Sequence, residues 1–471
     1  MKQFRLLAVA VGASLLVAAC GGGGGDAVQA PVVKPTSLVS FGDSLSDVGT
    51  YKVGVVAALG GGTYSVNGVT GAIPTKNWTE LIATQMGVAA PCPAQTGLNS
   101  ATALGGPIAV VDKPACRNYA QGGARVTDPV GPGSASAPVN SPLGQLTVPI
   151  VTQISTHLGR VGGNFSGTEL VTVMAGGNDV LRLLDTLVAN ATAAGATAGA
   201  AAGAQSFAST LVGLLAAGAT NPAAAASAIG AAIGALPAGT SSTVLVGTAV
   251  ATAAAQPGNA AVGAAAVYGP MVASAQAAAT TAGNAAGAAA GAAYAKTNGA
   301  AQAVFPMGEA GKQLGIYIKT QMLGKGAKYV AVVNLPDMSS APAGTSQSAD
   351  TQGLILNMVV YFNEALAYEL KDVPGVRVVD SFTELRNWVA NPTAYGITNA
   401  TTPACNLNAP ANGLATSATA QNGTSLVCNT TNLKPGDVSH YVFADTVHPT
   451  PYGYKLLAEL VTRNLTQAGW L

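Results

Sequence analysis

Two short segments at opposite ends of the sequence carry the residue types that nucleophilic catalysis requires. Ser44 stands in the sequence GDSLSD directly after an apolar run, and Asp445 stands three residues before His448. A carboxylate this close to a histidine can accept a hydrogen bond from Nδ1–H and leave Nε2 to take a proton from a serine. Because Pro449 biases the preceding backbone away from helix, we expect Asp445 and His448 to lie in a turn.

Each of these residues also has a plainer interpretation. Ser44 alone could be the N-cap of a helix, because serine is a favoured capping residue. Further aspartates stand near the candidate site, and we interpret them as structural residues whose carboxylates accept backbone N–H bonds: Asp43, Asp47 and Asp179. The other two histidines, His157 and His440, are interpreted as ordinary surface or capping residues.

Short apolar runs alternate with amphipathic segments along most of the chain. Buried strands are predicted at residues 38–41, 170–174, 329–334 and 376–380, with a further short strand near residues 118–119. Helices are predicted at residues 77–86, 151–158, 311–323, 351–371 and 451–466. Strands that alternate with helices favour an α/β fold with a mostly parallel sheet covered on both faces.

Parallel sheets of this kind bind ligands beyond the carboxyl ends of their strands. Polar, glycine-containing turns follow the first three predicted strands, at residues 42–44, 122–124 and 176–179. We therefore expect these three turns to meet at one edge of the sheet.

A long insertion interrupts this pattern at about residues 188–304. More than half of residues 191–300 are alanine or glycine, and Lys296 is the only charged residue among them. Alanine favours helix and glycine interrupts it, so we expect a largely helical insertion made of short helices or a hairpin with poorly specified packing. Two roles remain open: a passive, partly disordered insertion, or a mobile apolar cover over the active-site edge.

The N-terminal residues have the pattern of an export signal. Lys2 and Arg5 precede an apolar run that ends before Cys20, and VAAC at residues 17–20 resembles the lipobox of bacterial lipoproteins. We expect residues 1–19 to be a lipoprotein signal peptide and residues 20–36 a lipidated cysteine with a flexible tether. The predicted location is the cell envelope, as an outer-membrane lipoprotein anchored through its lipid. The alternative is an ordinary secretory signal and a secreted or periplasmic protein.

The remaining cysteines and the charge balance narrow the possibilities. Two sequence-local pairs, Cys92 with Cys116 and Cys405 with Cys428, predict two disulfides in an exported protein. A metal site is the rival interpretation, but the chain has no CxxC spacing and only three histidines. The net charge is +1 and no basic cluster is present, so we expect no nucleic-acid partner.

Four sequence blocks, in order, resemble the GDSL-type lipases and esterases of the SGNH hydrolase superfamily. The blocks are FGDSLSDVG at residues 41–49, NYAQGGA at 118–124, GGND at 176–179 and DTVHP at 445–449. Secondary matches are VNLPD at 333–337 and NPTAYG at 391–396, and the resemblance covers residues 37–465 apart from the insertion. One departure is Ala444, where lipase-like members often carry tryptophan.

This resemblance implies a flavodoxin-like, three-layer α/β/α sandwich with a five-stranded sheet for residues 37–471. It also implies a catalytic triad of Ser44, Asp445 and His448, an oxyanion hole of the Ser44 N–H, Gly123 N–H and Asn178 amide, and no cofactor or metal. The implied reaction is hydrolysis of a lipid or small acyl ester through an acyl-enzyme on Ser44. The alternatives are a carbohydrate esterase that deacetylates polysaccharides, and a catalytically idle lipoprotein that uses the fold for binding.

Overall fold

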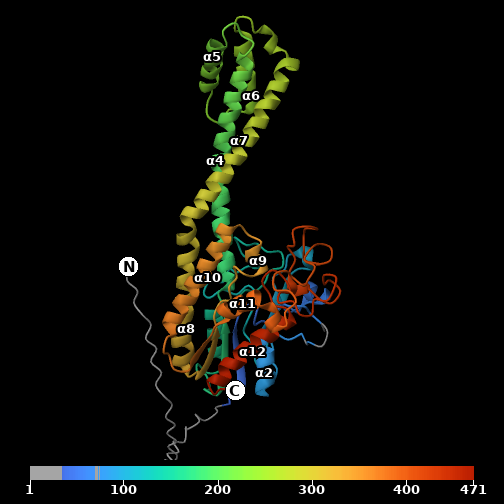
Figure 1. The fold of residues 1–471 in the computed structure, drawn as a ribbon, viewed down its shortest axis with the longest axis vertical. Helices are drawn as coiled ribbons and strands as arrows, with labels where there is room; N and C mark the ends of the chain where they lie inside the picture. The colour runs from blue at the N-terminus through green and yellow to red at the C-terminus, as the bar shows by residue number, and fades with distance from the viewer. Residues whose placement is uncertain (1–33, 69–72, 74) are drawn as a thin grey trace, which may run out of the picture.

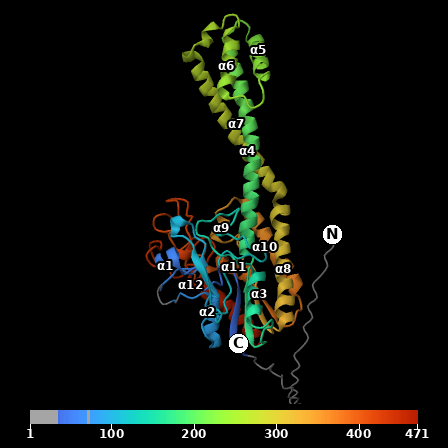
Figure 2. The ribbon, with the colours of Figure 1, turned by 180° about the vertical axis from the view of Figure 1, so that it is seen from behind.

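The computed structural model describes residues 34–68, 73 and 75–471, which form an α/β body and a long helical arm (Figure 1). The predicted signal peptide, Cys20 and most of the predicted tether lie outside the described residues. The body contains a parallel sheet, and the arm projects from one edge of that sheet (Figure 1, Figure 2).

Within the described residues, the main sheet has four parallel strands in the order β1-β4-β5-β6. They are β1 (Ser37–Gly42), β4 (Glu169–Met174), β5 (Tyr329–Val333) and β6 (Val376–Val379). The four longer predicted strands are confirmed, but β6 is an edge strand in which only Val379 is buried, so the expectation that it is buried is wrong. A small antiparallel hairpin of β2 (Gln95–Leu98) and β3 (Ile108–Asp112) lies outside this sheet and was not predicted.

Alternate residues of the strands face two separate hydrophobic clusters, which makes the body three layers thick. Val39 and Phe41 of β1 pack into one cluster, and Leu38 packs into the other. The first face is covered by α3 (Ile150–Arg160), α8 (Phe305–Tyr317) and α10 (Ala349–Leu370). The opposite face is covered by α2 (Trp78–Met86), α11 (Ser381–Ala390) and α12 (Pro451–Gln467). A two-residue side-chain period with both faces buried is what a covered parallel sheet requires.

The short fifth strand expected near residues 118–119 is reduced, among the described residues, to two isolated bridges of Asn118, one to Ser40 and one to Pro93. The Ser40 N–H donates to the carbonyl of Arg117, and the Tyr119 N–H donates to the carbonyl of Ser40. At the next position the Gln121 N–H still donates to the Gly42 carbonyl, but the Gly42 N–H donates to the side-chain oxygen of Gln153, whose NH2 group donates back to the Gly42 carbonyl. The outer edge of β1 is therefore covered partly by a side chain, which ends the pairing early.

Three of the predicted body helices, α2, α10 and α12, begin at side-chain caps. The Asn77 side chain accepts from the N–H of Glu80, whose carboxylate accepts from the Asn77 N–H, so α2 begins with a capping box. Thr450 caps α12, and Pro451 occupies its first turn. The remaining short helices of the body are α1 (Gly54–Ala58) and α9 (Pro342–Thr345). Single turns of 3₁₀ or π helix occupy Thr102–Leu104, Ala260–Gly263, Ala300–Val304, Ile318–Met322, Leu323–Lys325, Pro392–Tyr395 and Ser425–Val427.

The insertion forms the helical arm, which we define as residues 191–299. Two long antiparallel helices make its shaft, α4 (Gly177–Ala216) and α7 (Ala265–Gly299), and α5 (Pro222–Gly234) and α6 (Ser242–Ala254) form its tip (Figure 1). The first turns of α4 belong to the body, where Leu187 is buried in the same cluster as Phe41. The tip has a separate hydrophobic cluster that includes Leu211, Ile229 and Val250.

The structure contains a hairpin, one of the two forms expected for the insertion, with two shorter helices at its tip, and the expectation of poorly specified packing is wrong. A Cβ built on Gly195 would lie 2.6 Å from the carbonyl oxygen of Gly287, and one on Gly199 would lie 2.8 Å from that of Gly283. Glycine at every fourth position places these residues on one face of each helix, so the two backbones approach closely. Here glycine specifies the packing of the helices instead of interrupting them.

Candidate active site

The turns that follow the strands meet at one edge of the sheet, as their positions in the sequence predict. Ser44 lies two residues after β1, and Asn178 lies in the first turn of α4, directly after β4. His448 lies in the turn before α12. Together with Gly123, these residues line a single cavity of about 290 Å³.

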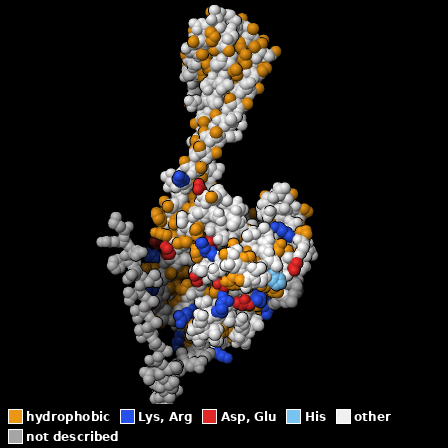
Figure 3. Space-filling model, in the orientation of Figure 1, with side chains coloured by type: hydrophobic (Ala, Val, Ile, Leu, Met, Phe, Trp, Pro, Cys, Tyr) orange, Lys and Arg blue, Asp and Glu red, His pale blue; other side chains and the backbone are white. Residues whose placement is uncertain are grey.

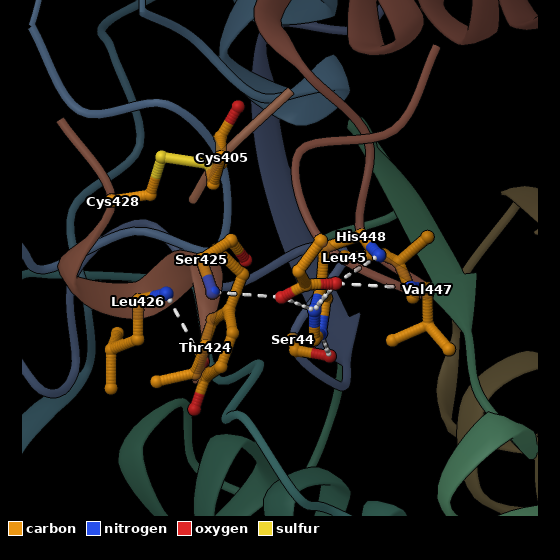
Figure 4. Close-up of polar contacts among 12 residues, drawn as sticks. Ser44, Leu45, Cys405, Thr424, Ser425, Leu426, Cys428, Val447 and His448 are labelled. Atoms are coloured by element: carbon orange, nitrogen blue, oxygen red, sulfur yellow. Dashed lines mark hydrogen bonds and ion pairs between the residues drawn. A yellow bond between two sulfur atoms is a disulfide. The ribbon is translucent and has the colours of Figure 1, made fainter. Parts of the chain in front are cut away.

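Ser44, His448 and Asp445 form a hydrogen-bonded chain (Figure 4). The distance from Ser44 Oγ to His448 Nε2 is 2.8 Å, and the distance from His448 Nδ1 to Asp445 Oδ2 is 2.7 Å. The imidazole therefore bridges the serine and the carboxylate, with one ring nitrogen directed to each. This is the geometry in which a neutral histidine can accept the serine proton and then be stabilised as a cation.

The Asp445 carboxylate is buried and accepts several N–H bonds. The backbone N–H groups of Val447 and His448 donate to Oδ1, and the Ser425 N–H donates to Oδ2 at 2.8 Å. Burial opposes ionisation of this carboxyl, but the charge of His448 and the hydrogen bonds from His448 and Ser425 outweigh it. The pKa of Asp445 is consequently held well below its usual range. The residue stays ionised and orients the imidazole.

A disulfide joins the two segments that flank this carboxylate. Cys405 and Cys428 are bonded, and the Cys405 N–H donates to the carbonyl of Ala444, next to Asp445 (Figure 4). The Cys428 N–H donates to the carbonyl of Ser425. Sequence reasoning missed Ser425, because a backbone donor leaves no residue-type signal. Both predicted disulfides are present, the second joining Cys92 to Cys116.

Three N–H donors border the cavity beside the serine. Gly123 has a positive φ, and a Cβ at this position would lie 2.3 Å from the Pro132 carbonyl oxygen, so the turn requires glycine. The Asn178 side-chain amide donates one N–H to the Ala124 carbonyl at 2.9 Å, which fixes its orientation and leaves its second N–H. Within the part of the chain that the structure describes, the backbone N–H groups of Ser44 and Gly123 donate to no other protein group.

Asp47 and Asp179 connect the site loops to one another. Asp47 accepts N–H bonds from Gly49 and Thr50 on its own turn and from Gly122 in the turn at residues 122–124. Asp179 accepts from the Arg125 guanidinium and the Val126 N–H. Both carboxylates therefore accept backbone N–H bonds, as the sequence analysis expects of structural aspartates.

Asp43 is buried beside Ser44, and few contacts compensate for the burial of its carboxyl. Its Oδ1 accepts from the Leu45 N–H at 3.1 Å, and its side chain borders the cavity. Burial raises the pKa of Asp43 to about 7, against the lowering effects of the Leu45 N–H and the charge of His448. The segment thus carries a carboxyl whose ionisation the fold disfavours.

Tyr64 packs against the candidate base, a contact that the sequence did not reveal. Its ring centroid lies 4.7 Å from that of His448, with an interplanar angle of 34°. The Tyr64 hydroxyl bonds to the side-chain amide of Gln145, and both side chains line the cavity. Tyr64 and Gln145 lie in loops without periodic pattern, so neither residue carried a signal that could have identified it.

The expectation that His157 is a surface or capping residue is wrong. Its side chain is buried among Phe41, Tyr119 and Phe165, because α3 turns this face toward the sheet. Burial lowers the pKa of His157 to about 4, which keeps the ring neutral in the core. His440 is partly exposed, bonds to the Ser439 hydroxyl and takes no part in the hydrogen-bonded chain of Ser44, His448 and Asp445.

No protein-family model matches this chain, and no curated protein matches it. Within residues 34–68, 73 and 75–471, no three histidine, cysteine, aspartate or glutamate side chains gather as a metal site would require.

Proposed function

We propose that this chain is a serine hydrolase of carboxylic esters, of the GDSL type within the SGNH hydrolases. The observation that carries the proposal is the hydrogen-bonded chain from Ser44 through His448 to Asp445 at the edge of an α/β sheet. The order and spacing of the four sequence blocks add to it. The sandwich has the layers expected of that family, although its sheet has four strands among the described residues.

The proposed reaction proceeds in two steps. Ser44 Oγ attacks the ester carbonyl while His448 Nε2 takes its proton; the carbonyl oxygen becomes an oxyanion that the N–H groups of Ser44, Gly123 and Asn178 stabilise. The ester C–O bond breaks, and the proton on His448 passes to the leaving alcohol oxygen. Water then attacks the acyl-enzyme with His448 as base, which releases the carboxylic acid and restores Ser44.

We also propose that the mature protein is attached to the cell envelope by lipid on Cys20. The sequence VAAC at residues 17–20 is the support for this location. Cys20→Ser should abolish incorporation of labelled fatty acid and release the protein from the membrane fraction. Labelling that persists in Cys20→Ser would contradict the proposal.

The direct test of the proposed reaction is covalent labelling with a fluorophosphonate probe together with hydrolysis of nitrophenyl esters. Wild-type protein should be labelled and active, and Ser44→Ala should lose both properties while remaining folded. Ser46→Ala is the matched control, because this serine lies in the same segment and its buried hydroxyl has no partner among the described residues. Labelling or turnover that survives Ser44→Ala would exclude the mechanism.

A further inference from the structure

The cavity at Ser44 extends from the triad into the hydrophobic layer beneath α11 and α12. At its mouth lie Ser44, Asn178 and His448. Its inner wall is formed by side chains that also belong to the hydrophobic cluster on that face of the sheet: Met174, Leu385, Trp388, Val442, Phe443 and Leu457. Each of these six side chains is at least nine-tenths buried. The space therefore continues into the protein interior and is not only a surface groove.

The depth of the cavity follows from the helix that forms one of its sides. Ser381, Leu385 and Trp388 all line it, and they occupy one face of α11 at spacings of four and three residues. Seven residues of α-helix rise about 10 Å. On the neighbouring helix, Gly453 and Leu457 line the same space over the first turns of α12. The cavity thus runs roughly parallel to both helices, away from the nucleophile.

The inner wall offers almost no hydrogen-bonding groups. Of the six inner side chains only Trp388 bears a polar atom, and its Nε1 has no partner among the described residues. Sugar hydroxyls buried here would lose their bonds to water without replacement, which is costly. A hydrocarbon chain would lose nothing of this kind and would gain from leaving water.

We propose that this cavity binds the acyl chain of the substrate, and that the enzyme prefers medium-chain acyl esters over acetyl esters. This inference rests on the proposed function, because the chain must be joined to a carbonyl at Ser44. An apolar cavity of about half this volume holds one benzene molecule, so the cavity at Ser44 accommodates an acyl chain of roughly eight to twelve carbons. Trp388 is the lining residue farthest along α11, and we assign it as the floor of the cavity that limits the length of the chain.

The first test is the chain-length dependence of kcat/KM for nitrophenyl esters from acetate to palmitate. Each added methylene that enters the cavity should raise kcat/KM by about fourfold, until the cavity is full. Beyond roughly twelve carbons kcat/KM should fall. A profile that is highest for acetate and declines with every added methylene would overturn the inference while leaving ester hydrolysis itself established.

The second test changes the cavity size and uses the ratio of kcat/KM for decanoate to that for acetate within each variant. Leu457→Phe should reduce this ratio at least tenfold by filling the cavity, and Trp388→Leu should move the optimum to longer chains. Leu460→Phe is the matched control, because Leu460 is buried in α12 but does not line the cavity. An equal loss of the ratio in Leu457→Phe and Leu460→Phe would contradict the assignment.

A third measurement does not depend on turnover. In the Ser44→Ala protein, sodium decanoate should raise the thermal midpoint in a saturable manner and quench tryptophan fluorescence, and sodium acetate should do neither. Decanoate that gives no saturable change would refute the cavity as an acyl-binding site. If wild-type protein hydrolysed no ester but Ser44→Ala bound decanoate, the proposed reaction would fail and the binding site would stand.

Discussion

Asn178 illustrates how much a single side chain at the site is expected to contribute. One of its amide hydrogens bonds the Ala124 carbonyl, and the other is the proposed donor to the oxyanion. Asn178→Ala should lower kcat roughly a hundredfold to a thousandfold with a smaller change in KM, because the oxyanion exists mainly in the transition state. Asn190→Ala, an exposed amide on the same helix, should leave kcat unchanged. Steady-state kinetics with a nitrophenyl ester measure both, and an unchanged kcat in Asn178→Ala would remove this residue from the oxyanion hole.

Tyr64 is expected to act through His448 and not through the substrate. A ring contact of this kind contributes about 1 kcal/mol, so Tyr64→Leu should lower kcat by roughly fivefold. Tyr64→Phe keeps the ring and should restore most of the loss. The comparison is made on kcat at saturating substrate. If both variants reduced kcat equally, the hydroxyl contact with Gln145 and not the ring contact would matter.

The burial of Asp43 predicts that the free energy of unfolding depends on pH. Its pKa is about 7 in the folded protein and 3.8 in the reference state, so the unfolded chain ionises first as the pH rises. Below pH 3.8 the carboxyl is protonated in both states, and Asp43 does not lower the free energy of unfolding. Between pH 3.8 and pH 7 the unfolded state is progressively favoured, because only there can the carboxyl ionise freely, and the free energy of unfolding falls. Asp43→Asn should remove this loss, making the variant relatively more stable at pH 8 than at pH 4, by on the order of 4 kcal/mol.

Chemical denaturation of wild type and Asp43→Asn at pH 4, 6 and 8 checks this difference. Asp372→Asn serves as control, because Asp372 is exposed. A difference between wild type and Asp43→Asn that is constant over this range would show that folding does not raise the pKa of Asp43.

The sequence predicts which candidate site residues lie together only where suitable residue types also stand at a short spacing. The proximity of Asp445 to His448 follows from their short separation and a proline, and the structure has the two side chains in contact. The environment of His157 was not accessible, because burial of a polar ring depends on which face of α3 meets the sheet. Tyr64 and His448 lie near opposite ends of the sequence, so only the tertiary fold creates their contact.

At the scale of elements, the pairing of α4 and α7 depends on glycine at the points of closest approach. Gly195→Ala should destabilise the arm, because the new Cβ would lie 2.6 Å from the Gly287 carbonyl. Gly213→Ala, in the same helix, meets nothing within 4 Å and should stabilise it by about 0.5 kcal/mol. Thermal unfolding followed by circular dichroism in the far ultraviolet measures both. If the thermal midpoint rose equally in Gly195→Ala and Gly213→Ala, the two helices would not pack through the face that carries Gly195.

The sequence predicted best the strands of the main sheet, because short apolar runs that end at polar turns mark them. β1, β4, β5 and β6 are apolar, short and followed by polar turns, and their bounds agree closely with the prediction. The lengths of α4 and α7 were not predicted, because glycine lowers intrinsic helix propensity. The close packing of two glycine-containing helices offsets that cost, but only when both helices are present. The pattern within one helical segment does not show that a second helix will pack against it.

In the whole molecule, the candidate site and the arm lie at the same edge of the sheet, because α4 begins at the site and continues into the arm. β1 begins at the opposite edge, so the predicted lipid tether enters far from Ser44. The arm, whose helix α4 is about 60 Å long, extends away from the body (Figure 2), and no residue between 191 and 299 lines the cavity. Its visible surface carries no charge beyond its base (Figure 3). Among the described residues, α4 is also the one helix with the length and mean hydropathy of a membrane span.

The arrangement of the arm disfavours one of the two roles that the sequence left open for the insertion, that of a cover over the active-site edge. A cover would have to lie over the mouth of the cavity, whereas the arm has its own hydrophobic cluster and projects away from the mouth. Its base must be kept in any deletion, because Leu187 and Val304 are buried in the body. The helices are in close backbone contact near Gly199 and Gly283, which gives a natural point for joining them.

Replacing residues 200–282 by a short Gly/Ser bridge between Gly199 and Gly283 should therefore leave a folded, active enzyme. The deletion removes the tip cluster as a unit and exposes none of the body's hydrophobic clusters, so the thermal midpoint of the body should change little. Turnover of short soluble esters and of emulsified long-chain esters should both stay within about twofold of wild type, because the cavity is intact. A selective loss on emulsified esters would show that the uncharged arm docks on the substrate surface, and an insoluble protein that cannot be refolded would show that the arm completes the fold.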